Sequence, residues 1–184
     1  MLVVKRDDAG ARVGFRRSPL AGERCTYWDT LMEEHHPHAR HLRRGRHSQI
    51  NQIYLITTCT QDRQPLFTDW YLGRIVVAHL READQLLLIE SLCFVVMPDH
   101  LHWLFALRDG ELATVINRVK SKSAIMINRY RGGGGTVWQK SFHDHALRAD
   151  EDVVGCARYV VANPLRAGLV KRVGDYPLWD AKWL

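Results

Sequence analysis

The stretch LLLIESLCFVVMPDHLHWLFAL, residues 86–107, contains two long apolar segments separated by Pro98-Asp99. Its β-branched and aromatic residues are typical of strands, and Pro-Asp is typical of a tight turn. The stretch therefore predicts two antiparallel strands joined as a hairpin.

The segments on either side of this hairpin alternate between strand and helix patterns. Helices are indicated by apolar residues at helical spacing, and strands by β-branched or aromatic content. The expected elements are a strand over 52–60, a helix over 71–85, a helix over 111–130, strand-like residues 137–148, and a helix over 151–163 that Pro164 ends. This order predicts an α+β fold, a ferredoxin-like βαββαβ antiparallel sheet with helices on one face, the other face free for a site, and an added C-terminal helix.

A chain of 184 residues predicts one packed domain with a short extension. Residues 1–48 lack sustained periodicity and end in a basic, histidine-rich stretch, so we expect a basic N-terminal arm followed by a domain over 49–184. The four cysteines are widely scattered, and no apolar run reaches the length of a membrane span. These features predict a cytoplasmic protein without a membrane segment.

The chain is basic, with 26 Lys+Arg against 20 Asp+Glu and a net charge of +6. Such a balance is typical of proteins that bind nucleic acid, and it is equally compatible with simple solubility. Charge alone leaves these two interpretations open.

Two histidines stand within the second strand of the hairpin. Because side chains alternate across a strand, His100 and His102 are expected side by side on one face, with Leu101 and Trp103 on the other. Neighbouring imidazoles can ligate one divalent ion, or they can be polar positions on a solvated sheet face. The same H-x-H spacing occurs at 36–38 and 143–145, but only 100–102 combines an apolar spacer, a preceding turn and strand sequence on both sides.

The last expected helix carries Tyr159 and Asn163, four residues apart and so on nearly the same face. A phenol with a pKa of about 10 is a weak nucleophile unless its target is made strongly electrophilic, for example by a divalent ion on a phosphate. Taken alone, Tyr159 is better explained as an amphipathic surface residue with its ring on the core.

Several segments together resemble the REP-associated tyrosine transposases, a domesticated bacterial branch of the single-tyrosine transposases in the HUH endonuclease superfamily. The resemblance covers about residues 42–184 and lies in LRRGRHSQINQIYLITTCTQDRQPLF (42–67), VVMPDHLHWLF (95–105), VWQKSFHDHALR (137–148), ARYVVANPLRAGLV (157–170) and YPLWDAKWL (176–184). It implies that His100 and His102 bind Mg²⁺ or Mn²⁺, that Asn163 is the third ligand, and that Tyr159 is the nucleophile.

The implied activity is cleavage and rejoining of single-stranded DNA. Tyr159 would attack the scissile phosphate to form a 5′-phosphotyrosine, and a free 3′-hydroxyl would reverse the step. The implied substrates are REP elements, palindromes that fold as hairpins, so the protein would be nucleoid-associated. Mobile members of the family are dimers that exchange the tyrosine helix and domesticated members are monomers; we expect a monomer, with a dimer as the alternative.

Basic residues are required to hold a folded DNA strand. The candidates are Arg43, Arg44 and Arg46 in the arm, Arg118, Lys120 and Lys122 on the second helix, and Arg166 near the tyrosine helix. Asp144, His145 and Arg148 match a further family pattern, for which a DNA-contacting role and a structural role both remain open. Trp138 and Phe142 either stack on bases or belong to the core.

Two other functions are alternatives to this enzyme. The first is a non-catalytic regulator that binds palindromes and derives from a transposase, although such a protein has no evident need for the histidines and Tyr159 together. The second is a phosphoesterase with paired H-x-T motifs, which is disfavoured because no second motif of that kind occurs in the sequence.

Overall fold

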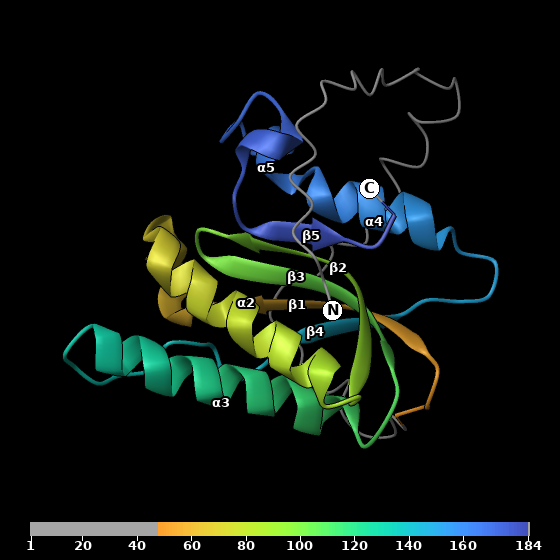
Figure 1. Ribbon diagram of the computed structural model, residues 1–184, viewed down its shortest axis with the longest axis horizontal. Helices are drawn as coiled ribbons and strands as arrows, with labels where there is room; N and C mark the ends of the chain where they lie inside the picture. The colour runs from red at the N-terminus through yellow and green to blue at the C-terminus, as the bar shows by residue number, and fades with distance from the viewer. Residues whose placement is uncertain (1–47, 184) are drawn as a thin grey trace.

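The computed structural model describes residues 48–183, which form one five-stranded antiparallel sheet with helices on both faces (Figure 1). Along the chain the strands and helices are β1 (Ile53–Cys59), α2 (Trp70–Gln85), β2 (Ile89–Met97), β3 (His100–Leu107), α3 (Leu112–Tyr130), β4 (His143–Ala146), α4 (Val153–Val161), α5 (Asn163–Arg166) and β5 (Trp179–Ala181). Short 3₁₀ turns lie at Gln61–Arg63, Leu66–Thr68 and Val173–Asp175. The strand order is β4-β1-β3-β2-β5, which confirms the α+β fold class.

The central hairpin forms as predicted. Strands β2 and β3 pair antiparallel with Met97 opposite His100, so Pro98 and Asp99 make the turn between them. Strand β1 lies on the other side of β3, where Thr57 is opposite His102. The histidines therefore stand on the middle strand of the sheet, close to the hairpin turn.

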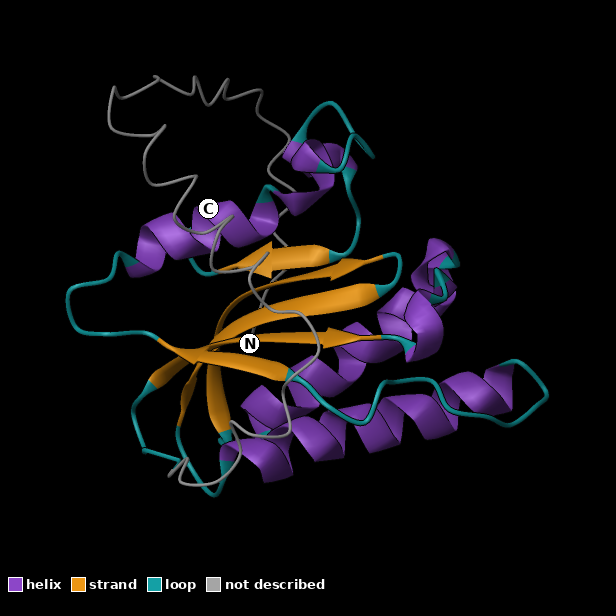
Figure 2. Cartoon of the chain, turned by 180° about the vertical axis from the view of Figure 1, so that it is seen from behind, coloured by secondary structure: helices purple, strands orange, loops and turns teal. Residues whose placement is uncertain are grey.

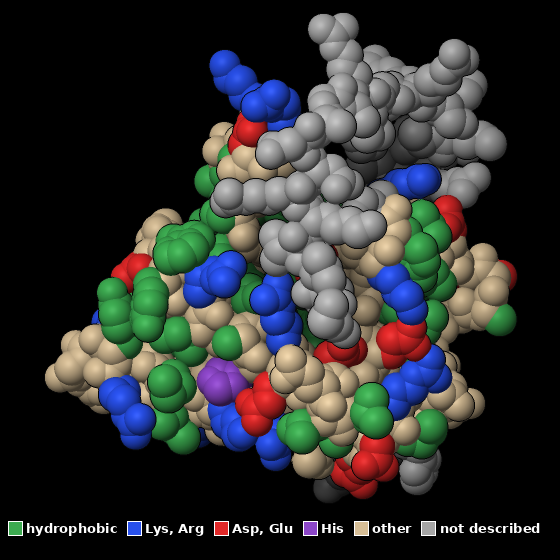
Figure 3. All heavy atoms as spheres, in the orientation of Figure 1, with side chains coloured by type: hydrophobic (Ala, Val, Ile, Leu, Met, Phe, Trp, Pro, Cys, Tyr) green, Lys and Arg blue, Asp and Glu red, His purple; other side chains and the backbone are tan. Residues whose placement is uncertain are grey.

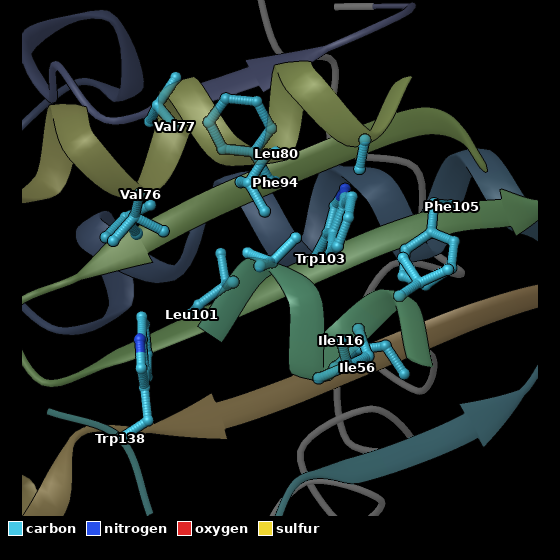
Figure 4. Close-up of a cluster of buried hydrophobic side chains, with 14 of the residues drawn as sticks. Ile56, Val76, Val77, Leu80, Phe94, Leu101, Trp103, Phe105, Ile116 and Trp138 are labelled. Carbon is cyan, nitrogen blue, oxygen red and sulfur yellow. The ribbon is translucent and has the colours of Figure 1, made fainter. Parts of the chain in front are cut away.

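Helices α2 and α3 cover one face of the sheet and enclose the larger core (Figure 2). Alternate residues of β3, among them Leu101, Trp103 and Phe105, point into this core and are at most 2% exposed (Figure 4). Burial of such side chains contributes roughly 1.5–3 kcal/mol each. Within residues 48–183, no helix is long and apolar enough to cross a membrane.

The opposite face carries the histidines and is partly covered by α4. Here Val95 and Leu104 of the sheet belong to a second core cluster with Cys156 and Val160 of α4. The predicted alternation of β3 is confirmed, because His102 and Leu104 lie on this face. The apolar residues of α4 pack directly against this face, so the added C-terminal helix covers part of it.

The sheet adds detail to the expected elements at two places. Within 137–148 only His143–Ala146 forms a strand, β4. Trp138 makes an isolated bridge to Thr60, and the side chains of Trp138 and Phe142 pack in or against the larger core. The C-terminal tail supplies the edge strand β5, paired with β2. A strand of three residues is too short to produce a recognisable alternation in sequence.

Pro164 does not end the helical structure. Helix α4 ends at Val161, Ala162 keeps helical dihedral angles, and Asn163 begins the short helix α5. Proline is accepted in the first turn of a helix because no intrahelical hydrogen bond requires its missing N–H. Asn163 thus lies at the junction of two helices rather than at the end of one.

Candidate metal and nucleophile site

The two histidine rings of β3 lie next to each other. Their centroids are 4.7 Å apart and the rings meet edge to face at 80°. His102 is buried, at 5% exposure, and His100 is half-buried at the end of the strand. The predicted placement of both imidazoles side by side on one face is confirmed.

Each ring is oriented by a hydrogen bond through Nδ1. His102 Nδ1 lies 2.8 Å from the hydroxyl of Thr57, and His100 Nδ1 lies 2.5 Å from Oδ1 of Asp99. When Nδ1 is the protonated nitrogen, Nε2 carries the lone pair that can ligate a metal. Such a partner on the second nitrogen is the usual companion of a metal-binding histidine.

The charges around the pair favour the neutral imidazole at His102. Burial lowers the pKa of His102 well below its ordinary value, and the electrostatic influence of the neighbouring His100, Arg166 and Arg63 lowers it further. The hydrogen bond from His100 lowers the pKa of Asp99, and Arg63, 3.2 Å away, acts in the same direction. Asp99 is therefore ionised and accepts a hydrogen bond from the Nδ1–H of His100. His102 stays neutral.

Tyr159 is carried by α4, which packs on β2, β3 and β5 on the histidine face. Asp152 caps this helix by accepting a hydrogen bond of 2.9 Å from the N–H of Gly155. A Cβ on Gly155 would lie 2.6 Å from the Asp152 carboxylate, so glycine permits this close cap. The Tyr159 ring is half-buried against the second core cluster.

Asn163 has a defined amide orientation. Its Nδ2 donates to the carbonyl of Val160 at 2.9 Å, and its Oδ1 accepts from Nη2 of Arg166 at 2.9 Å. Only the oxygen of an amide has lone pairs available to a cation. Oδ1 is thus the atom with which Asn163 would ligate a metal.

The donor set fits an ion that completes its coordination with oxygen ligands. Within residues 48–183, no three His, Cys, Asp or Glu side chains are grouped so that they could hold a metal. The two histidines supply two nitrogen donors, and Asn163 offers an amide oxygen from the start of α5. Mg²⁺ and Mn²⁺ accept such oxygens, and Mg²⁺ usually keeps positions for water and substrate phosphate.

Of the DNA-binding candidates within 48–183, Arg166 alone lies at this site. Its guanidinium stacks 3.6 Å above the centroid of the Tyr159 ring. Arg43, Arg44 and Arg46 lie outside the described residues. The three candidates on α3 belong to the layer on the other face of the sheet (Figure 1).

The α3 residues have partners within the protein. Glu82 of α2 pairs with Lys122 and, at 3.3 Å, with Arg118, and hydrogen bonds from Lys122 and His79 lower the pKa of Glu82 to about 2. Lys120 is buried and its ammonium donates to two backbone carbonyls of the 139–141 segment, which is a structural role. On the face shown in Figure 3, basic and acidic side chains are interspersed.

The site also contains residues that the sequence did not indicate: Thr57, Asp99 and Arg63. The adjacency of Asp99 to His100 was a usable signal, whereas Thr57 reaches His102 only through strand pairing. His143 of β4 lies opposite Thr57, so it stands on the histidine face as well. The third H-x-H motif therefore does lie on a strand, next to the site rather than in it.

The pattern of Asp144, His145 and Arg148 is explained in part by Glu151. The Glu151 carboxylate lies 2.9 Å from Nε2 of His145 and accepts the backbone N–H of Arg148 at 2.9 Å. These bonds connect β4 to the turn before α4. They favour the structural interpretation of His145, and Trp138 and Phe142 likewise pack in or against the core.

Comparison with known proteins identifies the family and the fold. The family model described as "Transposase IS200 like" matches residues 48–161. A protein of Haemophilus influenzae named as a REP-associated tyrosine transposase is 28% identical over 138 residues, covering 68% of this chain and 77% of that protein. The REP-associated tyrosine transposase of Escherichia coli is 29% identical over 90 residues, covering 48% of this chain and 52% of the relative. A solved REP-associated tyrosine transposase bound to a REP hairpin has a TM-score of 0.57 at 24% identity, covering 73% of this chain and 79% of that one, and shares the fold.

Proposed function

Since this chain belongs to the family of IS200-like transposases, we propose that it cuts and rejoins single-stranded DNA, with Tyr159 as nucleophile and a divalent cation on His100 and His102. One observation carries the proposal: both imidazoles are oriented through Nδ1 on the sheet face that the tyrosine helix covers. A site with this arrangement has two nitrogen donors and a phenol on neighbouring elements.

Each residue has a task in this reaction. Thr57 and Asp99 hold the rings so that Nε2 is the ligating atom, and burial keeps His102 neutral. The cation, when bound, would draw charge from a phosphate oxygen and so favour attack at phosphorus. Neutral ligands suit this task because they leave the positive charge of the ion uncompensated.

The covalent step transfers a phosphoryl group to the phenol. The oxygen of Tyr159 forms a bond to phosphorus as its proton is lost to solvent, the P–O3′ bond breaks, and the 3′-oxygen takes up a proton as it leaves. The product is a 5′-phosphotyrosine and a free 3′-hydroxyl. Attack by a 3′-hydroxyl on the phosphotyrosine reverses these bond changes and restores Tyr159.

The proposed substrate is a palindromic hairpin of the REP type. A solved relative is bound to such a hairpin, and the net charge of +6 suits a polyanionic partner. We place this activity on the nucleoid in the cytoplasm. A monomer is favoured because α4 packs on the sheet of its own chain, next to the histidines.

The test is a cleavage assay with a labelled single-stranded hairpin and Mn²⁺. Wild type should give both nicked DNA and a covalent protein–DNA band on a denaturing gel, and Tyr159→Phe should give neither while still shifting the hairpin on a native gel. Tyr130→Phe is the matched control, because Tyr130 is exposed at the end of α3 and stacks on Tyr71.

Cleavage by Tyr159→Phe at the wild-type rate would overturn the assignment of the nucleophile. If the wild type binds the hairpin but does not cut it at any concentration of Mn²⁺, the protein is instead a palindrome-binding regulator that has kept the fold of a transposase. His102→Ala should lose cleavage together with Mn²⁺ binding, which separates failure at the metal from failure at the tyrosine.

A further inference from the structure

The guanidinium of Arg166 in α5 connects Tyr159 of α4 with Asn163 at the start of α5. Nη1 donates to the backbone carbonyl of Tyr159 at 2.7 Å, Nη2 donates to Oδ1 of Asn163 at 2.9 Å, and the group stacks on the Tyr159 ring. We call these three contacts the Arg166 bridge. They place a positive charge on the one atom with which Asn163 can ligate a cation.

A divalent cation bound to His102 and to Oδ1 of Asn163 would therefore meet an arginine already bound to that oxygen. Two cations on one carbonyl oxygen repel each other strongly at such short range. Arginine has an alternative partner of its own, because its planar fork matches the oxygens of a phosphate.

We propose that Arg166 and the divalent cation are alternative partners of Asn163 Oδ1, and that the phosphate of bound DNA draws the guanidinium away from this oxygen. The inference rests on the proposed function, because it takes the metal site as given. Arg166 then has a positioning role at Asn163 in the free protein and contacts a phosphate in the DNA complex, as its sequence position predicts.

Metal and DNA binding are then coupled. Without DNA the Arg166 bridge competes with the metal, so the ion binds weakly; with DNA the bridge opens and the ion binds more tightly. Coupling of this kind is reciprocal, so the metal raises the affinity for DNA by the same factor. The cation that would activate the phosphate for attack by Tyr159 is therefore bound tightly only in the DNA complex.

The experiment is calorimetric titration of Mn²⁺ into the DNA-free protein and into its hairpin complex, using Tyr159→Phe as the background so that no DNA is cut. In the DNA-free protein, Arg166→Ala should bind Mn²⁺ about tenfold more tightly, since a competing positive charge is gone. Arg172→Ala is the matched control: Arg172 lies in the same C-terminal region but pairs with Asp175, and its loss should leave Mn²⁺ affinity unchanged. Thermal melting of each variant verifies that it is folded.

A second pair of variants separates competition from general repulsion. In an Asn163→Ala background there is no oxygen to compete for, so adding Arg166→Ala should change Mn²⁺ affinity far less than it does in the presence of Asn163. Equal tightening in both backgrounds would overturn the proposal, because the charge would then act without the shared oxygen. Unchanged or weaker Mn²⁺ binding by Arg166→Ala with Asn163 present would overturn it too.

These outcomes are distinguishable from failure of the proposed function. If His102→Ala abolishes Mn²⁺ binding but Arg166→Ala does not tighten it, the metal site stands and only the Arg166 inference fails. If the parent protein binds no Mn²⁺ either with or without the hairpin, the metal assignment fails and the inference fails with it.

Discussion

His102 combines two properties that usually exclude each other, deep burial and a polar ring. The hydrogen bond to Thr57 satisfies Nδ1, and burial disfavours the imidazolium form. A protonated His102 would have to lose its charge before it could bind a metal, so the lowered pKa favours metal binding near neutral pH.

The same shift makes stability depend on pH. The folded-state pKa of His102 lies below the unfolded value of about 6.5, so the unfolded chain binds more protons as the pH falls through that range. The free energy of unfolding should therefore decrease from pH 7 to pH 5, by at most about 1.4 kcal/mol per pH unit from this residue. Chemical denaturation at a series of pH values measures this slope.

The matched variant is His102→Asn, whose amide nitrogen can keep a hydrogen bond to Thr57 but does not titrate. Its slope between pH 7 and pH 5 should be shallower than that of the wild type. The lowered pKa values of Asp99 and Glu82 stabilise the folded protein, and this stabilisation is lost only at more acid pH, below about 4.5. These two carboxyl groups therefore do not contribute to the slope between pH 7 and pH 5. Identical slopes for the two proteins would contradict the buried neutral state of His102.

Most of the candidate site could be predicted from local sequence, and the exceptions have a common cause. Strand alternation predicted that His100 and His102 share a face, and helical spacing predicted the same for Tyr159 and Asn163, but the roles assigned to these residues came from the family resemblance. Thr57 contributes to the site from 45 residues away, because the register of β1 on β3 places it opposite His102. Sequence periodicity predicts which face a residue occupies, but not which residue of another strand lies beside it.

At the scale of elements, long segments were predictable and short ones were not. The hairpin and the helices α2, α3 and α4 carry strong periodic patterns over many residues. Strands β4 and β5 have four and three residues, and they form because partners in β1 and β2 offer free edges. Their pairing depends on the assembled sheet rather than on a local propensity.

The C-terminal segment before β5 is held against α2 by a close contact. Leu178 is 3% exposed, and a Cβ placed on Gly73 would lie 2.4 Å from its Cδ1. The backbone carbonyl of Leu178 also accepts a hydrogen bond of 2.8 Å from Val96. Glycine at this position of α2 is therefore required by packing, in spite of its low helix propensity.

Gly73→Ala should lower the free energy of unfolding by about 1–2 kcal/mol, since the cost of overpacking exceeds the gain in helix propensity. In a Leu178→Ala background, the side-chain atoms that clash with the new methyl group are absent. There the same Gly73→Ala change should be neutral, or stabilising by up to about 1 kcal/mol. Urea denaturation of the four proteins measures this reversal, and equal losses in both backgrounds would show that the contact does not limit residue 73.

At the scale of the whole molecule, the sheet lies between two helical layers, with α2 and α3 on one face and α4 on the other (Figure 2). The α2 and α3 layer buries the larger core, and its charged residues Arg118 and Lys122 pair with Glu82. The other face carries the histidines and the tyrosine helix. For the proposed DNA-binding function, the positive charge on this face includes Arg166 and Arg63, and the basic arm predicted for residues 1–48 would add to it.

This division predicts which arginines control the salt dependence of DNA binding. Replacing Arg43, Arg44 and Arg46 by alanine should weaken hairpin binding and reduce the slope of log K against log[salt] by about 0.9 for each residue that contacts a phosphate. Replacing Arg118 and Lys122, which both pair with the carboxylate of Glu82 in the layer on the opposite face of the sheet, should change the slope less. Fluorescence anisotropy of a labelled hairpin over a range of salt concentrations provides both slopes. A larger change for the α3 pair than for the arm would place the DNA on the α2 and α3 layer, away from the histidines, and would contradict binding at the candidate site.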